Sequence, residues 1–187
     1  MVQNPKYKSA ECIIHQLCDI VSKNGNLLLN VGPYADGSFH PDAVKTLEKI
    51  GDWLALNGEA IYETRPYLIA AEGPTVVEDA DYDTQRIAEQ LDKGAAADVR
   101  SNVLTGRDYR FTTRGETLYV IAMGWPEEGW FRIRTLRENG PCAKKVGRVT
   151  LIGQKEPLTF IRDGEALHVK APERKPCEYA YVLKIEE

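Results

Sequence analysis

The histidines of this chain are few and lie far apart. His15, His40 and His168 occur in unlike sequence contexts, and nothing in the sequence joins them into one motif. Histidine is a frequent general base and metal ligand, but both roles need partners close by. We therefore expect surface or helix-start positions for these three side chains, and neither a metal site nor histidine-based catalysis.

The cysteines also argue against metal chemistry. None of the four belongs to a CxxC pair, the spacing that usually marks a zinc site. We expect free, buried thiols that behave as small apolar side chains. A bridge between the two later cysteines, in a sheet region, stays open. The four are Cys12, Cys18, Cys142 and Cys177. No metal and no cofactor is expected.

One polar side chain interrupts a short apolar run. Residues 27–31 read Leu-Leu-Leu-Asn-Val, between a glycine turn and the pair Gly32-Pro33. Such a run is typical of a strand buried on both faces, as in a parallel sheet covered by helices. Asn30 would then be a buried amide that needs a hydrogen bond. It would either orient groups at a ligand site or hold a neighbouring loop.

Two tryptophans flank a turn at residues 126–129. Exposed aromatic faces stack on sugar rings in carbohydrate-binding modules, so Trp125 and Trp130 are candidates for such contacts. The simpler explanation is that both pack beneath the loop. Trp53, in contrast, lies on an apolar helical stripe and is expected in the core.

The composition is that of a folded protein without an obvious nucleic-acid or membrane role. The 187 residues are 43% hydrophobic and 28% charged, enough for a packed core. A net charge of −4 argues against a nucleic-acid partner. No apolar segment of about 18 residues is present, so no membrane span is expected. The first residues lack the apolar core of a secretory signal, which leaves the compartment open.

Residues 9–57 predict a helix, a strand and a second helix. The first helix covers 9–22, with Ser9 as its N-cap and Gly25 suited to the left-handed position after it. The second starts at His40-Pro41-Asp42, where proline fits the first turn, and ends at Asn57-Gly58. Its apolar stripe is Val44, Leu47, Ile50 and Trp53. This order fits the last part of an α/β sheet or barrel.

The pattern changes to short strands near Arg65-Pro66, where we place a domain crossing. Asp163-Gly164 is a hairpin signal between two of these strands. Short strands at this spacing are typical of an antiparallel sandwich. A polar stretch at 80–98 does not fit and predicts a helix or a mobile insertion. The strands are expected at 68–71, 108–114, 117–123, 130–136, 148–152, 158–161, 166–169 and 179–185.

Four ordered motifs in the first third of the chain resemble the α-L-fucosidases of glycoside hydrolase family 29. They are residues 19–33, Asp36-Gly37, residues 50–54 and residues 57–62 followed by Thr64. The stretches 108–115 and 118–126 resemble the C-terminal β-sandwich of that family more loosely. The resemblance implies an α+β fold: a helix-strand-helix remnant of a (β/α)₈-like barrel at 1–66, then an antiparallel β-sandwich at 67–187 with an insertion near 78–104.

The resemblance also implies an activity and the place of its catalytic groups. The family removes terminal α-linked L-fucose with retention of configuration, using an aspartate nucleophile and a glutamate acid/base. Both precede the motif that begins near Asn26, and residues 1–10 contain no aspartate or glutamate. We therefore expect no catalytic residue in this chain and no activity from the chain alone.

The resemblance implies substrate contacts at Leu27 and Asn30. The family often places an aromatic residue at the position of Leu27, against the C6 methyl group of fucose, and a leucine keeps the apolar contact. The alternative for Leu27 is a plain core leucine. Asp36 lies in the loop after the expected strand, where barrels place active-site groups, but we expect it to serve the Asp-Gly turn.

The expected partner is a fucosylated glycan, bound as substrate by the intact enzyme. The alternative function is a carbohydrate-binding or stabilising β-sandwich module. An apolar strand without neighbours also invites pairing with another chain. We therefore expect self-association through the exposed barrel remnant, or repacking of residues 9–57 onto the sandwich. An intact parent could be secreted, periplasmic or lysosomal, and the sequence does not choose between these.

Overall fold

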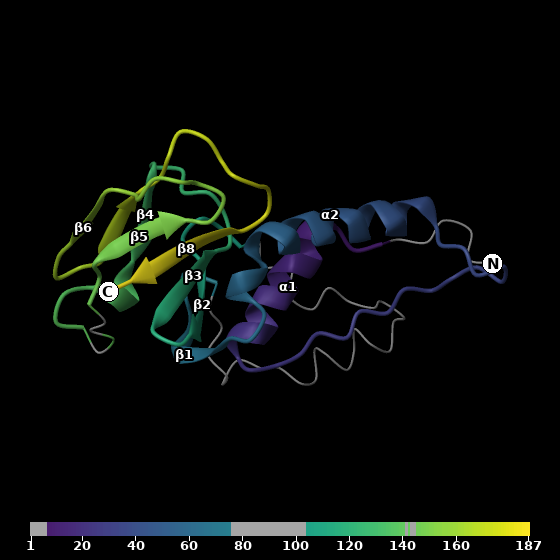
Figure 1. Cartoon of the computed structure of the whole chain (residues 1–187), viewed down its shortest axis with the longest axis horizontal. Helices are drawn as coiled ribbons and strands as arrows, with labels where there is room; N and C mark the ends of the chain where they lie inside the picture. Colours follow the sequence, from purple (N-terminus) through teal and green to yellow (C-terminus); the bar gives the residue numbers. More distant parts are fainter. Residues whose placement is uncertain (1–6, 76–103, 141, 143–144) are drawn as a thin grey trace.

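Two helices cover one face of a five-stranded sheet, and a three-stranded sheet covers its other face (Figure 1). The structure is a computed structural model that describes residues 7–75, 104–140, 142 and 145–187. Both sheets are antiparallel throughout. The α+β class and the sandwich predicted from the sequence are confirmed.

The two helices begin where the sequence places them. Helix α1 spans Ala10–Ser22, and the Oγ atom of Ser9 accepts a hydrogen bond from the Cys12 amide at 3.1 Å. Helix α2 spans Pro41–Asn57, and Nδ1 of His40 accepts one from the Asp42 amide at 3.2 Å. A short 3₁₀ turn, η1, follows at Gly58–Ala60.

The end of α1 differs from the prediction by one residue. Asn24, not Gly25, takes the left-handed conformation, with φ 65°. The Gly25 amide donates to the Ile20 carbonyl at 2.9 Å and the Asn24 amide to Val21 at 3.0 Å. This is a Schellman end, which an asparagine adopts readily because its short side chain tolerates the left-handed region.

The eight strands in the described part of the chain occur where alternation predicted them, in the sheet orders β1-β2-β3-β8-β5 and β4-β7-β6. The segment predicted at 130–136 is a strand only as far as Ile133, because a 3₁₀ turn, η3, occupies Arg134–Leu136. There the Glu72 carboxylate accepts hydrogen bonds from the amides of Arg134 and Thr135, at 2.7 and 2.6 Å. The strand bounds are β1 Arg65–Glu72, β2 Tyr109–Arg114, β3 Thr117–Ala122, β4 Trp130–Ile133, β5 Arg148–Leu151, β6 Phe160–Arg162, β7 Leu167–Lys170 and β8 Tyr181–Glu186.

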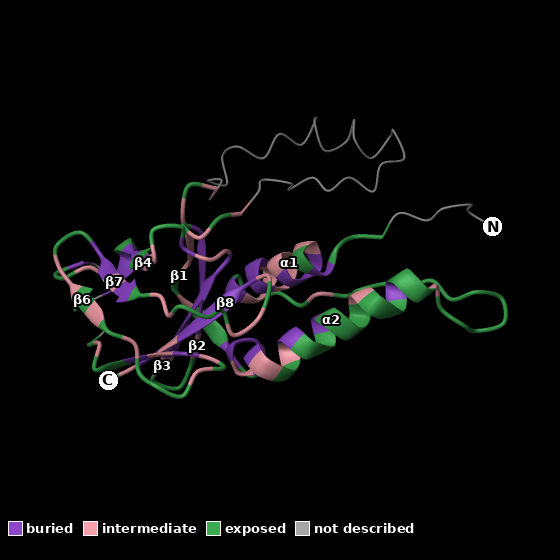
Figure 2. Ribbon diagram, turned by 90° about the horizontal axis from the view of Figure 1, so that it is seen from above, coloured by how far each residue is buried: buried purple, intermediate pink, exposed green. Residues whose placement is uncertain are grey.

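Alternation along the central strands builds two cores. On β3, Leu118 and Val120 face the small sheet, whereas Tyr119 and Ile121 face the helices. All four are at most 1% exposed, so this sheet is covered on both faces, as Figure 2 also shows. Every side chain on the helix-facing side of the sheet must therefore be apolar or have a partner.

The strand predicted at residues 27–31 is not formed, and that prediction is wrong for this chain. Residues 25–40, which we call the arm, run beside α2 away from the sheets and have no helix or strand (Figures 1 and 2). Leu28 is 87% exposed. A strand needs neighbours for its amides and carbonyls, and the described part of the chain places none beside these residues.

The apolar stripe of α2 is only half used. Ile50 and Trp53, towards the end of the helix, are buried against the sheet as predicted. Val44 and Leu47, in its first half, are 37% and 36% exposed. Figure 2 shows this half of the helix projecting beyond the sheets. The sheet therefore covers only the second half of the apolar stripe.

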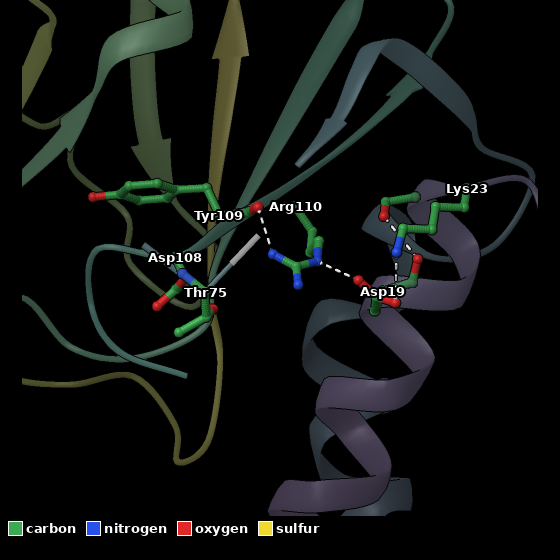
Figure 3. Close-up of polar contacts among 7 residues, drawn as sticks. Asp19, Lys23, Thr75, Asp108, Tyr109 and Arg110 are labelled. Carbon is green, nitrogen blue, oxygen red and sulfur yellow. Dashed lines mark hydrogen bonds and ion pairs between the residues drawn. The ribbon is translucent and has the colours of Figure 1, made fainter. Parts of the chain in front are cut away.

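The insertion predicted near 78–104 lies almost entirely outside the described residues, but its two flanks are joined. The buried carboxylate of Asp108 accepts hydrogen bonds from the amide and hydroxyl of Thr75 on one side (Figure 3). Its other oxygen accepts from the amide and hydroxyl of Thr105, both at 2.9 Å. Four donors therefore fix the end of β1 next to the start of β2.

A buried ion pair fastens α1 to the sheet (Figure 3). Nε of Arg110, on β2, lies 2.7 Å from Oδ1 of Asp19, and their side chains are only 6% and 12% exposed. Lys23 Nζ lies 3.0 Å from the other carboxylate oxygen. Burial by itself would raise the pKa of Asp19, but the charges of Arg110 and Lys23 outweigh it and lower that pKa. The carboxylate therefore stays ionised near neutral pH.

The loop before β8 is held by both helices. Nε2 of His15, on α1, lies 3.1 Å from the carbonyl of Tyr179, and Nε1 of Trp53, on α2, donates to the carbonyl of Ala180 at 2.9 Å. Tyr179 has φ 76°, which is unusual for a bulky residue and persists only where neighbours enforce it. Burial lowers the pKa of His15, so its ring is neutral at neutral pH.

Replacing Arg110 by methionine should lower the free energy of unfolding by about 3 kcal/mol, because it leaves the Asp19 carboxylate buried without its main partner. The measurement is urea unfolding followed by tryptophan fluorescence. Arg114→Met is the matched control on the same strand, since its ion pairs with Glu59 and Glu63 are long and exposed. It should cost less than about 1 kcal/mol. Equal losses in the two variants would contradict a special role for Arg110.

The stability of the protein should fall as pH drops through the ordinary pKa of histidine, 6.5, in part through His15. Because the folded-state pKa lies below this value, the unfolded chain binds the proton more readily, and acid favours unfolding. His15→Gln keeps a donor for the Tyr179 carbonyl and does not titrate. We expect a smaller shift in its urea midpoint between pH 7.5 and 5.5 than in the wild type. Parallel pH profiles would refute this assignment.

Candidate functional site

The arm carries both substrate contacts expected from the sequence. Leu27 is half-buried and packs against the core between helices and sheet, as the core alternative predicts. Asn30 is exposed, so the buried, hydrogen-bonded amide expected there is not formed. The reason is the missing strand, since only a paired strand would enclose that side chain. Contact of either residue with a substrate stays a prediction.

A tight turn at residues 34–38 ends the arm. The Tyr34 amide donates to the Ser38 carbonyl at 2.7 Å, and Gly37 has φ 85°. Oδ1 of Asp36 accepts hydrogen bonds from the Ser38 amide and hydroxyl, at 3.0 and 2.7 Å. These bonds lower the pKa of Asp36 and keep it ionised. The prediction that Asp36 serves the turn is confirmed.

Aromatic rings gather beside this turn. The ring of His40 lies 5.3 Å from that of Tyr7 and 6.2 Å from that of Tyr34, measured between centroids. The two tyrosines are 40% and 43% exposed. Because Nδ1 of His40 accepts the Asp42 amide, the neutral ring carries its proton on Nε2.

The carboxyl groups with clearly shifted pKa values are not suited to general acid catalysis. Asp19, Asp36 and Asp163 all have lowered pKa values. At Asp163 the main causes are hydrogen bonds from the amides of Ala166 and Glu165. A retaining glycosidase needs an acid with a raised pKa, about 5–5.5 Å from its nucleophile. These three groups stay ionised and serve turns or an ion pair.

The tryptophans support packing more than sugar binding. Trp125 is half-buried and meets the rings of Phe131 and Tyr181 edge-on, at 5.6 and 4.8 Å between centroids. Nζ of Lys175 lies 5.8 Å from its ring centroid. Trp130 is half-buried within β4. The expectation that Trp125 packs beneath its loop is confirmed.

The histidines and cysteines do not converge. His40 caps α2, His15 holds the loop before β8, and His168 lies 3.1 Å from Asp163 on the small sheet. None of the four cysteines is joined to another in a disulfide. Among the described residues no group of three or more histidine, cysteine or acidic side chains is placed to hold a metal. Nor is any helix in that part of the chain long and apolar enough to cross a membrane.

The polar residues that fasten the structure together are not recognisable from the sequence pattern. Arg110 lies between Tyr109 and Phe111 in the alternating segment 108–114, and alternation alone does not show that its polar side is covered. Its actual face is covered by α1, so it needs the partner that Asp19 supplies. The one available signal was Asp19 itself, a carboxylate with apolar neighbours on both sides in an amphipathic helix. Pairing the two required knowledge of the packing.

Two family models match this chain, in sequence order. The model described as "Alpha-L-fucosidase" matches residues 1–59, and the model described as "Alpha-L-fucosidase C-terminal domain" matches residues 102–186. Among curated relatives, the tissue α-L-fucosidase of Homo sapiens is 27% identical over 92% of this chain. An α-L-fucosidase of Branchiostoma floridae is 25% identical over 96%. The chain spans only 30% and 33% of the lengths of these two relatives.

Solved structures of α-fucosidases are also similar to this chain. An α-fucosidase of Thermotoga maritima superposes with a TM-score of 0.71 and 26% identity, over 98% of this chain and 36% of that one. The same enzyme in complex with fucose gives a TM-score of 0.69, over 96% of this chain and 34% of that one. The chain therefore belongs to the α-L-fucosidases of glycoside hydrolase family 29, of which it comprises the end of the catalytic domain followed by the C-terminal domain.

Proposed function

We propose that this chain acts as the C-terminal part of a retaining α-L-fucosidase, whose whole hydrolyses terminal α-L-fucosyl linkages of fucosylated glycans. The observation that carries the proposal is the pair of family matches, to the catalytic domain at 1–59 and to the C-terminal domain at 102–186. A relative solved in complex with fucose supports the substrate class. Leu27 and Asn30 are the residues of this chain that we assign to substrate contact.

The two regions have different parts in this proposal. Residues 1–66 supply the closing end of the catalytic domain, including the arm. Residues 67–187 form the β-sandwich that carries it, with an insertion near 78–104. The Arg110–Asp19 pair and the loop contacts of His15 and Trp53 support a carrying role for the sandwich, because they fasten both helices to it.

A stabilising role for the sandwich is the second candidate function. It is favoured by those same buried contacts, which would hold the catalytic end in place. The carbohydrate-binding version has less support, since Trp125 directs its ring into packing with Phe131 and Tyr181. The two versions differ in fucose titrations followed by tryptophan fluorescence, where only a binding module gives a saturable change that Trp130→Ala removes.

The purified 187-residue chain should release no nitrophenol from nitrophenyl α-L-fucoside. The physical reason is that the family's nucleophile and acid/base precede the motif near Asn26, while Asp36 is held ionised in its turn. The Thermotoga maritima enzyme, assayed alongside, is the positive control. Turnover that remains in the Asp36→Ala variant after contaminating activity is removed would show that the chain has a catalytic pair of its own.

The chain should self-associate through the exposed apolar part of the arm. Leu28 and Leu29 are 87% and 38% exposed, on a backbone that can still pair. Sedimentation velocity over a concentration series should show a rising average mass, and Leu28→Lys should abolish the rise. Leu68→Lys is the matched control, because Leu68 is 73% exposed but lies on β1. A monomer at all concentrations, or an equal effect of both variants, would exclude association through the arm.

A further inference from the structure

We propose that the turn at residues 34–38, together with Tyr7 and His40, is a second sugar-contact site, which binds the pyranose ring to which the fucose is attached. This inference rests on the proposed function, because that function gives the turn its place in an enzyme. The site lies at the far end of the arm, distant from the sandwich (Figures 1 and 2).

The apolar part of the site is a pair of exposed tyrosine rings. The ring centroids of Tyr7 and Tyr34 lie 5.3 and 6.2 Å from that of His40, with planes tilted by 36° and 52°. Because the rings are tilted, they do not close face to face. Both remain more than a third exposed. Open aromatic faces fixed beside polar groups suit the C–H face of a pyranose.

The polar part offers both an acceptor and a donor. Oδ1 of Asp36 is engaged by the amide and hydroxyl of Ser38, and its carboxylate is ionised and fully exposed. His40 uses Nδ1 to accept the Asp42 amide, so Nε2 carries a proton and can donate. A sugar hydroxyl both donates and accepts, so it can use these two groups together. A purely apolar partner would leave both unused.

The position of the turn identifies which sugar it contacts. In the proposed enzyme, residues 27–31 lead into the catalytic centre and α2 follows, so residues 32–40 are the connection from a strand to a helix. In (β/α)₈ barrels these connections build the active-site face. Leu27 and Asn30, assigned to the fucose, precede the turn in the same arm. The turn is therefore placed at the rim, beside the sugar that leaves with the glycosidic oxygen.

The hydrogen bonds that shape the turn are internal to it. Its hydrogen bonds, from the Tyr34, Gly37 and Ser38 amides, all end on residues 34–38. Of the ring contacts between described residues, none involves Tyr62, although it is 57% exposed. Tyr62 is therefore a matched control: an exposed tyrosine outside the cluster.

The test is a titration of the ¹⁵N-labelled chain with lactose and 2′-fucosyllactose, followed by amide chemical shifts. Sorbitol, a polyol without a ring face, is the control ligand. We expect saturable shifts at Gly37, Ser38 and His40 with both sugars, in the millimolar range, and none with sorbitol. Tyr34→Ala should weaken binding about tenfold, whereas Tyr34→Phe, which keeps the ring, and Tyr62→Ala should bind as the wild type does.

Two outcomes would overturn the site. One is the absence of a saturable shift at these amides up to about 50 mM sugar, a concentration well above the expected dissociation constant. The other is equal binding by the wild type and Tyr34→Ala. A monomeric sample, verified by sedimentation, excludes a turn hidden by self-association. The readout is independent of hydrolysis. If this chain binds lactose but an intact enzyme that contains it does not hydrolyse fucosides, the proposed function is refuted and the site stands. If the intact enzyme hydrolyses fucosides but this chain does not bind lactose, the site alone is refuted.

Discussion

The ion pair between Arg110 and Asp19 is the constraint on which the arrangement of the two halves depends. Removing two charges from water costs several kcal/mol each, so such a pair is tolerated only where geometry and additional bonds compensate. Here the Arg110 guanidinium also donates to the Tyr109 carbonyl, at 3.0 Å, and Lys23 contacts the second carboxylate oxygen. A helix displaced by even one turn would leave both charges buried and unpaired. The pair therefore fixes the position of α1 on the sheet more strictly than apolar packing can.

The same logic explains why polar contacts gather at the junctions of this fold. Asp108 joins the end of β1 to the start of β2, Glu72 receives the amides of η3, and His15 and Trp53 hold the loop before β8. In each case the bonded backbone groups lie where the chain leaves a regular element and loses its ladder partners. The apolar cores decide which faces meet, and these contacts decide the register in which they meet.

Local sequence predicted much of this structure because much of it is set locally. The starts of α1 and α2 follow from the capping residues Ser9 and His40. The turn at Asp36 follows from the hydrogen bond that its side chain accepts from the Ser38 amide, two residues later. The strands of the sandwich follow from alternation along each one. The Arg110–Asp19 pair could not be found in this way, because its members are far apart in sequence and each resembles a surface charge. The prediction of a strand at 27–31 was wrong for a different reason. These residues have the apolar pattern of a buried strand, but a strand forms only where a neighbouring strand pairs with it.

The arm therefore contains two kinds of structure with different requirements. Residues 34–38 satisfy their own hydrogen bonds, so the turn has the same shape whatever lies next to it. Residues 27–31 have the composition of a doubly buried strand and yet expose Leu28 almost fully, so their conformation depends on what covers them. A partner that supplied neighbouring strands would change the first part of the arm and leave the turn intact. For that reason the shape of the turn is set by this chain itself, whereas the conformation of residues 27–31 depends on what packs against them.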